Sequence, residues 1–114
     1  FDHVKVGTYT TSKLSIITDN KERIIVKEHG GIELKGAVGI NVAYPGEDVD
    51  LQVNGPIRIQ DKKIQVGTAI PDTGNYNIGD IIYNSAPTAG GWVGWICIAS
   101  GMPGDWKAFG AIQS

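Results

Sequence analysis

The sequence predicts an all-β protein, and two features of its composition favour that fold class. Isoleucine occurs 16 times and valine 9 times, against 3 leucines, and β-branched residues favour extended backbone. Glycine also occurs 16 times, and no stretch of ten residues repeats its apolar positions with the 3.6-residue period of a helix. We therefore expect short strands joined by turns, and no helix.

The first 66 residues predict a series of short strands with turn sequences between them. Asn54-Gly55 is the strongest hairpin signal, because both residues tolerate the positive φ that a two-residue hairpin turn needs. Pro56 follows it, and a residue without an N–H suits the start of a strand or a sheet edge. The other turn signals are Asp19-Asn20, His29-Gly30-Gly31, Pro45-Gly46 and Asp61-Lys62. The predicted strands are 13–18, 23–27, 32–35, 39–43, 49–53, 56–59 and 63–66.

Apolar and polar residues alternate in several of these strands, so that each strand has one apolar and one polar face. In 32–35, Ile32 and Leu34 lie on one face, and Glu33 and Lys35 lie on the other. Each strand contributes few apolar side chains, and a small monomer built in this way is marginally stable. Packing on the Trp-rich C-terminal segment or oligomerisation would remedy this. We favour a trimeric β-prism or shaft over residues 1–66, in which the apolar edges of three chains meet along an axis.

Residues 67–77 predict a linker, because Gly, Pro, Asn and Thr dominate it and the strand rhythm stops there. Residues 67–114 then predict a small C-terminal β module, with strands at 80–83, 92–99 and 106–112. The middle strand is apolar on both faces, with Trp92 and Ile96 on one and Trp95 on the other. We expect this strand to be central in its sheet and covered on both sides.

Charge, length and cysteine content argue against several classes of protein. The formal net charge is -2 and lysines alternate with acids, so the chain lacks the basic stripe that a nucleic-acid partner needs. No apolar segment reaches transmembrane length and no signal peptide is present, so we expect no membrane partner. Cys97 is the single cysteine and lies between two isoleucines, which predicts a buried, inert thiol. The chain begins at Phe1 without an initiator methionine, and we expect it to be a piece of a longer protein.

No pattern of residues predicts a catalytic centre, a metal site or a cofactor site, and we expect none in this chain. Glu47, Asp48 and Asp50 offer oxygen ligands for calcium but lack the spacing of an EF-hand loop, so we interpret them as solvated. His3 and His29 are far apart in sequence, although histidines of three chains can meet on an axis and bind a metal. Paired carboxylates in a cleft between subunits, as in glycosidases, stay an open alternative.

The aromatic residues of the C-terminal module allow two interpretations. Aromatic faces suit the C–H faces of pyranose rings, but aromatic side chains also dominate cores and interfaces by area. Because Gly90-Gly91 places Trp92 at a strand end, our hypothesis is that Trp92, Tyr83 and Tyr76 form the rim of a saccharide groove. The residues expected to pack in the core or between subunits are Trp95, Trp106, Phe109, Ile96, Ile98, Leu51, Val53, Ile57 and Ile59.

Two motifs connect the second half of the chain to a known family. Residues 106–112 follow a W-K-x-F-G-x-I pattern, and residues 51–57 follow an L-x-V-x-G-x-I pattern. Together with the 67–71 bridge and the 79–112 block, they extend over residues 49–114. In this order the motifs resemble the C-terminal end of bacteriophage tail spikes and tail fibres, including pre-neck appendage proteins.

The resemblance implies a homotrimeric module at the distal end of a phage tail, attached to an upstream spike or fibre shaft. It also implies host attachment through a cell-surface glycan, with any depolymerase activity lying upstream of this fragment. In some relatives the C-terminal domain is instead an intramolecular chaperone that drives trimer assembly and is then cleaved off, and this is the alternative function. A third alternative is that a bacterial surface or secreted β-helical enzyme carries the same module.

Overall fold

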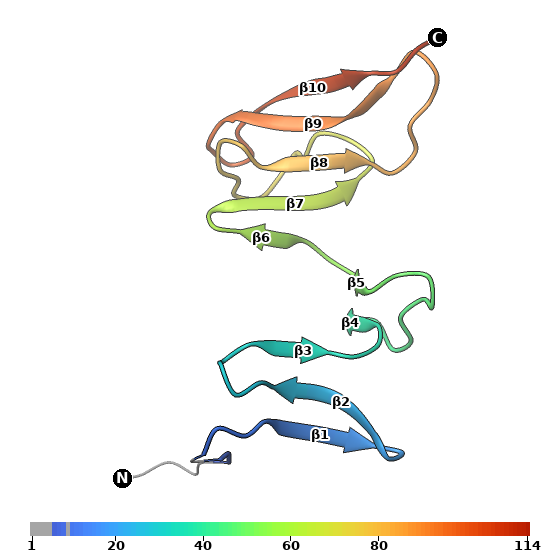
Figure 1. Ribbon diagram of the computed structural model, residues 1–114. Helices are drawn as coiled ribbons and strands as arrows, with labels where there is room; N and C mark the ends of the chain where they lie inside the picture. Colours follow the sequence, from blue (N-terminus) through green and yellow to red (C-terminus); the bar gives the residue numbers. More distant parts are fainter. Residues whose placement is uncertain (1–5, 9) are drawn as a thin grey trace. The chain divides into compact units, whose positions relative to one another are not determined.

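The computed structural model describes residues 6–8 and 10–114, and these form ten strands and no helix (Figure 1). The all-β fold class is therefore confirmed. Each predicted strand segment is present, with ends displaced by up to three residues. Within the described chain, no helix is long and apolar enough to cross a membrane. The strands are β1 (Leu14–Thr18), β2 (Lys21–Val26), β3 (Ile32–Leu34), β4 (Val38–Ile40), β5 (Leu51–Val53), β6 (Ile57–Ile59), β7 (Lys62–Gly67), β8 (Ile81–Asn84), β9 (Trp92–Ala99) and β10 (Asp105–Ala111).

The chain forms two compact units, Phe1–Gln52 and Val53–Ser114. This boundary differs from the sequence-based division between residues 66 and 67. The reason is that β6 and β7 belong to the same sheet as β8, β9 and β10. Residues 67–77, predicted as a linker between domains, instead join β7 to β8 within that sheet.

The first unit contains an antiparallel sheet in the order β1-β2-β3 and a separate β4-β5 pair. The β1–β2 hairpin turns at Asp19 and Asn20, whose φ angles of 52° and 54° lie in the left-handed region. Asp and Asn adopt this region more readily than most residues, so the predicted turn is confirmed. The register shifts between Ile16 and Ile17, where a β-bulge brings Glu22 opposite Ile17.

The second unit contains a five-stranded sheet in the order β10-β9-β8-β7-β6 (Figure 1). All its neighbouring strands are antiparallel except β7 and β8, which are parallel. Parallel neighbours need a crossover connection, and residues 68–80 supply it. The central position predicted for β9 is confirmed, because β9 pairs with β8 and with β10.

The hairpin predicted at Asn54-Gly55 does not form. β5 pairs with β4, whereas β6 pairs with β7. A type I′ turn needs left-handed backbone at both central residues, but Asn54 does not have a positive φ and the φ of Gly55 is 153°. The β6–β7 hairpin instead turns at Gln60 and Asp61, one residue before the predicted Asp61-Lys62 turn, and Gln60 has a φ of 54°.

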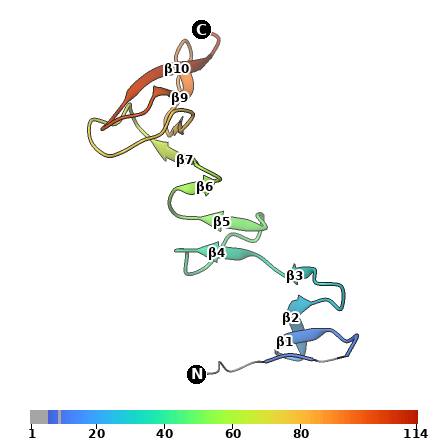
Figure 2. The ribbon, with the colours of Figure 1, turned by 90° about the vertical axis from the view of Figure 1, so that its left-hand side faces the viewer.

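The core of the second unit lies on one face of its sheet, which we call the covered face. Ile82, Cys97 and Trp106 form the buried cluster, and Tyr76 and Trp95 pack against it. Tyr76 belongs to the crossover, which bulges to one side of the strands (Figure 2). The ring of Tyr76 meets that of Trp106 edge-on, with centroids 5.1 Å apart. The predicted burial of the Cys97 thiol is confirmed.

Candidate functional site

The opposite side of the five-stranded sheet carries an uncovered apolar surface, which we call the open face. The register places Tyr83 opposite Gly94 and Ile57 opposite Ile64, and paired residues lie on the same side of a sheet. Side chains alternate between the two faces along each strand. Apolar residues of the open face come from all five strands, and they are Ile57, Ile59, Ile64, Val66, Ile81, Tyr83, Trp92, Ile96, Phe109 and Ala111.

The open face is exposed to solvent in the single chain. Tyr83 is 48% exposed and Trp92 is 45% exposed, and Ile57, Ile59 and Val66 are exposed as well. The expectation that β9 is covered on both sides is therefore not met in the single chain. The crossover packs on the covered face, and no segment of the described second unit buries Trp92 and Ile57.

Two neighbouring residues hold the aromatic side chains of the open face in place. The Asn84 Nδ2 atom donates a hydrogen bond to the Trp92 carbonyl oxygen over 3.0 Å, which ties the start of β9 to the end of β8. Gly94 lies between Tyr83 and Phe109 in the register. A side chain at Gly94 would overlap the Ile82 carbonyl oxygen and come within 3.2 Å of the Phe109 ring. Glycine thus allows the β8 backbone and the Phe109 ring to approach β9 closely.

The β1–β3 sheet has an apolar face of the same kind. Leu14 pairs with Val26, Ile16 with Ile24, and Ile24 with Leu34, so these residues share one side of the sheet. Most of them are exposed in the single chain. The members of this β1–β3 apolar face are Leu14, Ile16, Ile24, Val26, Ile32 and Leu34.

The other side of the β1–β3 sheet is a charged face. Lys13 Nζ lies 2.7 Å from a carboxylate oxygen of Glu22, and Lys27 Nζ lies 3.1 Å from one of Glu33. The hydrogen bond from Lys13, helped by one from the Ser15 hydroxyl, lowers the pKa of Glu22. The side chain of Ile25 is buried among these groups.

Charged and polar residues also border a pocket of about 650 Å³ on this face. The hydrogen bond from Lys27 lowers the pKa of Glu33. His29 is exposed in its turn, and its Nε2 atom lies 3.0 Å from a Glu28 carboxylate oxygen. The lining residues are Thr11, Ser12, Lys13, Glu22, Ile25, Lys27, Glu28, His29, Glu33 and Lys35.

The structure separates the three aromatic residues proposed to form a saccharide groove. Tyr83 and Trp92 lie on the open face as diagonal neighbours, because Tyr83 pairs with Gly94, two residues from Trp92. Tyr76 packs on the covered face against Trp106. These three side chains therefore do not form the rim of one groove. Tyr76 is in addition held by Lys63, whose Nζ lies 4.2 Å from the ring centroid.

The residues predicted to pack divide into two sets. Trp95 and Trp106 belong to the core cluster or pack against it, and the Trp106 indole N–H donates to the Pro103 carbonyl oxygen over 2.8 Å. Ile96 and Phe109 are half-buried on the open face, and Val53 is half-buried in β5. The exposed members are Leu51, Ile57, Ile59 and Ile98.

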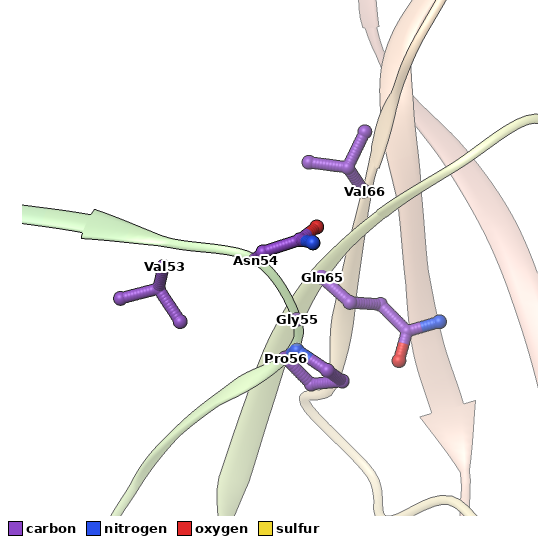
Figure 3. A pocket seen from close by; sticks show the side chains of 6 residues that line it. All are labelled: Val53, Asn54, Gly55, Pro56, Gln65 and Val66. Atoms are coloured by element: carbon purple, nitrogen blue, oxygen red, sulfur yellow. The ribbon is translucent and has the colours of Figure 1, made fainter. Parts of the chain in front are cut away.

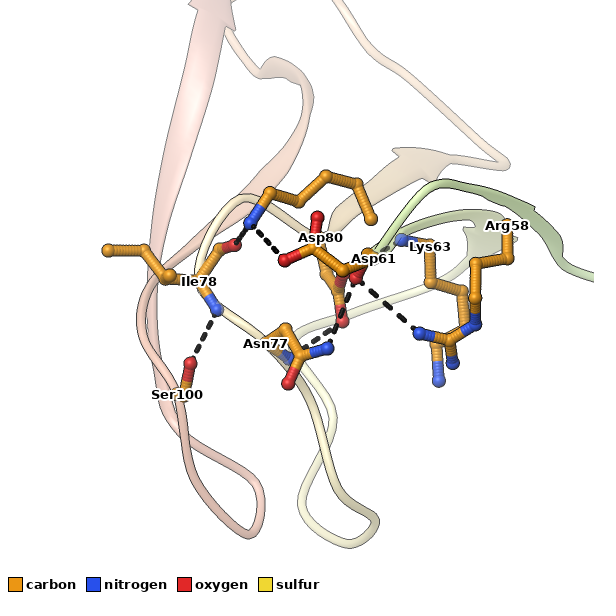
Figure 4. Close-up of polar contacts among 8 residues, drawn as sticks. Arg58, Asp61, Lys63, Asn77, Ile78, Asp80 and Ser100 are labelled. Carbon is orange, nitrogen blue, oxygen red and sulfur yellow. Dashed lines mark hydrogen bonds and ion pairs between the residues drawn. The ribbon is translucent and has the colours of Figure 1, made fainter.

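Asp80 is a buried carboxylate that the sequence did not indicate as an important residue. One of its oxygens accepts the Lys63 backbone N–H and the other accepts the Asn77 backbone N–H, both over 2.8 Å (Figure 4). The Asp80 carbonyl oxygen accepts the Cys97 N–H. This one residue therefore joins the crossover to β7 and to β9. The signal was an aspartate beside a glycine at a strand start, since aspartate is depleted in strands.

The same region has a second set of hydrogen bonds around the turn between β6 and β7. The Asn77 amide and the Arg58 guanidinium both donate to the Asp61 carbonyl oxygen (Figure 4). The Ser100 hydroxyl accepts the Ile78 backbone N–H over 2.7 Å. The Lys62 ammonium lowers the pKa of the Asp61 carboxyl. These contacts position the crossover.

A pocket of about 310 Å³ lies where the chain enters β6 (Figure 3). Its lining consists of Val53, Asn54, Gly55, Pro56, Gln65 and Val66. The side chains of Gln65 and Val66 point to opposite sides of β7. The two amides can form hydrogen bonds with a ligand, but no lining residue titrates near neutral pH. This pocket therefore lacks the groups for acid–base or nucleophilic catalysis.

No group of three or more His, Cys, Asp or Glu residues within residues 6–8 and 10–114 is arranged to hold a metal ion. Glu47, Asp48 and Asp50 are exposed. His3 lies outside the described residues. The Cys97 thiol donates to the Ala99 carbonyl oxygen over 3.2 Å and lies in the core, where a substrate does not reach it.

No protein-family model, curated protein or solved structure matches this chain. Its function is therefore inferred from its sequence and from the faces of its two sheets.

Proposed function

We propose that this chain is a homotrimerising C-terminal tip of a bacteriophage tail spike or tail fibre, and that it contributes to the recognition of host-surface polysaccharide. The motifs in residues 49–114 support the family. The observation that carries the proposal is that each unit exposes one apolar sheet face, while its other face is covered or charged. The fold is suited to bury these faces between chains.

The size of the apolar faces supports assembly. With strands about 4.8 Å apart and a rise of about 3.3 Å per residue, the open face measures roughly 24 Å by 18 Å in plan, or about 430 Å². The β1–β3 apolar face adds about 220 Å² by the same estimate. Their sum is comparable with the 800 Å² or so that each partner contributes to a standard protein interface.

The small core supports the same conclusion. Among the described residues, the buried hydrophobic side chains are Ile25, Ile82, Cys97 and Trp106. Burying a half-exposed Ile or Val contributes on the order of 1 kcal/mol. Assembly therefore offers this chain apolar stabilisation that the single copy lacks.

In this proposal the chain has no catalytic role, cofactor or metal, and any depolymerase activity belongs to the upstream shaft. The charged face of β1–β3 stays in contact with solvent and presents hydrogen-bonding groups to a host glycan. Three identical tips then raise the strength of weak contacts through effective concentration. The localisation that follows is the distal end of the tail, outside the host cell.

The oligomeric state in solution tests the proposal most directly. We expect sedimentation equilibrium at micromolar concentration to give three times the 12.2 kDa chain mass. A stable 12.2 kDa monomer that unfolds cooperatively would refute it. The recognition part is tested by adding free protein to a phage adsorption assay, where we expect competition with the particle.

The same apolar faces favour a second candidate, the intramolecular chaperone. Three chains that bury these faces set a common register, which is what an upstream shaft needs for assembly. The two functions differ in the mature particle. A chaperone is absent from purified virions, whereas a receptor-binding tip is present at full length, and mass spectrometry of virion proteins distinguishes them.

A further inference from the structure

We propose that the open face is the contact surface between copies of this chain, so that Trp92 and Tyr83 lie between subunits and do not stack on a saccharide. This inference rests on the homo-oligomer proposed above and identifies the surface that forms it. It also reverses the role that the sequence gave to these two aromatic residues.

The chemistry of the open face favours a protein partner over a glycan. Its polar members among the described residues are the Tyr83 hydroxyl and the ammonium groups of Lys62 and Lys107. Lys62 Nζ already donates to the Ile78 carbonyl oxygen over 2.7 Å and pairs with Asp61. A saccharide carries a hydroxyl on most ring carbons, and each one buried without a partner costs free energy. The open face therefore lacks the hydrogen-bonding groups that a glycan needs.

A second copy of the chain is the occupant that matches this surface. The other large surfaces of the described chain are the charged face of β1–β3 and the polar turns, which are not complementary to a sheet of Ile, Val and Trp. Its apolar sheet surfaces are the open face and the β1–β3 apolar face. In a threefold assembly the same face of each chain can be directed toward the axis, where it meets its two symmetry mates. The apolar centre of the open face is then buried, while the Lys107 ammonium on the edge strand β10 keeps contact with solvent.

The assignment is tested by a matched pair of substitutions, Ile57→Glu and Ile70→Glu. Ile57 is 42% exposed on the open face, and Ile70 is 46% exposed in the crossover. Both variants replace the same residue at similar exposure, and urea unfolding of each variant measures its effect on folding separately. We expect Ile57→Glu to weaken association at least tenfold in sedimentation equilibrium, and Ile70→Glu to leave it unchanged. If both variants self-associate as strongly as the wild-type chain does, the inference is overturned.

Tryptophan fluorescence gives a second measurement that does not depend on a destabilising change. Trp95 and Trp106 are shielded in the single chain, whereas Trp92 is 45% exposed. Dilution below the association midpoint should therefore shift the emission to the red and increase acrylamide quenching. Trp92→Phe keeps an apolar ring on the face and should assemble, but its emission should no longer change on dilution.

The outcomes separate this inference from the proposed function. A trimer in which Ile57→Glu assembles normally, or in which Trp92 emission is insensitive to dilution, contradicts the open face as the interface and leaves the trimer intact. A monomeric wild-type chain contradicts both. Glycan-array binding that is lost in Trp92→Ala while the oligomer persists would assign Trp92 to a saccharide site and overturn the inference.

Discussion

The two larger sheets of this molecule, β6–β10 and β1–β3, reach different degrees of burial. The β6–β10 sheet has a crossover packed on one face, and this creates a core of Ile82, Cys97 and Trp106. The β1–β3 sheet is built from hairpins alone, and Ile25 is its one buried hydrophobic side chain among the described residues.

The difference shows what a connection contributes to a small β unit. Hairpin turns join strands at the edge of a sheet and leave both faces open, whereas a crossover between parallel strands must pass over one face. The crossover here carries Tyr76 onto Trp106 and is held by the buried carboxylate of Asp80. Both sheets still have one apolar face that is largely exposed to solvent in the single chain.

The largest expected effect comes from comparing Ile82→Ala with Ile25→Ala. Ile82 is 2% exposed and Ile25 is 5% exposed. Ile82 lies between a sheet and a packed crossover, so its truncation leaves a cavity and should cost about 2–5 kcal/mol. Ile25 is lined by flexible Lys and Glu side chains that can close over the gap, so its truncation should cost less, near the lower end of that range at about 2 kcal/mol. Urea unfolding followed by circular dichroism at one protein concentration measures both, and equal losses would remove the contrast between the sheets.

A smaller effect is expected at Asp80, the residue that fixes the crossover. Asp80→Ala leaves the backbone N–H groups of Lys63 and Asn77 without their acceptor. A buried donor without a partner costs about 1–3 kcal/mol, so we expect a loss of about 2 kcal/mol or more. Asp80→Asn keeps one acceptor oxygen and should lose less.

Amide hydrogen exchange gives a readout for Asp80 that is specific to the crossover. In Asp80→Ala, faster exchange should appear at the amides of the crossover and of β7, while the β1–β3 amides are unchanged. Asp50→Ala removes an exposed aspartate of the first unit and serves as the control. If the crossover amides of Asp80→Ala exchange at the wild-type rates, Asp80 does not hold the crossover in place.

The smallest effect is the response of the β1–β3 sheet to acid. The folded state lowers the pKa of Glu22 and of Glu33 from their ordinary value of 4.5, through hydrogen bonds from Lys13 and Lys27. A lowered pKa favours the ionised form in the folded state. The stabilisation of the folded state by ionised Glu22 and Glu33 is therefore complete above pH 4.5. It is lost as the pH falls through the lowered pKa values that the two carboxyls have in the folded state.

Nuclear magnetic resonance can follow this acid response in each sheet. We expect signals of β1–β3 to weaken or shift at a higher pH than those of β8 and β9. In the double variant Glu22→Gln/Glu33→Gln, the NMR signals of β1–β3 should depend less on pH than in the wild-type chain. Because the pairs are near the surface, about 1 M salt, with a Debye length of about 3 Å, should reduce the effect in the wild-type chain. Identical acid transitions in the wild type and the double variant would argue against these pairs as its cause.

Much of the local structure was predictable from sequence. The bounds of β9 agree with the predicted 92–99 strand, and the burial of Cys97 was expected from the apolar run around it. Trp106 was expected to pack in the core or between subunits, and it lies in the core. The division between residues 66 and 67 failed to anticipate that β7 pairs with β8 across the glycine-rich 67–77 segment. Turn composition does not show whether a loop joins two domains or crosses one sheet, because both need the same flexible residues.

The candidate site was predicted only in part. The sequence indicated that Trp92 is exposed and that Trp95 and Trp106 pack, and the single chain agrees. It grouped Tyr76 with Trp92 and Tyr83, although the crossover places Tyr76 on the other face. Asp80 was not selected, because one acidic residue at a strand start is normally solvated, and the scarcity of aspartate in strands was its one sequence signal.

By itself, the sequence determined that this protein is all-β and which residues alternate within each strand, because the two-residue period of a strand is a local property of the chain. The tertiary structure alone decided which strands pair, which face the crossover covers and which apolar residues stay in solvent. Those outcomes depend on contacts between residues far apart in sequence, such as Lys63 with Asp80 and Tyr76 with Trp106. Contacts of that kind form only when the loop between them closes in one particular way.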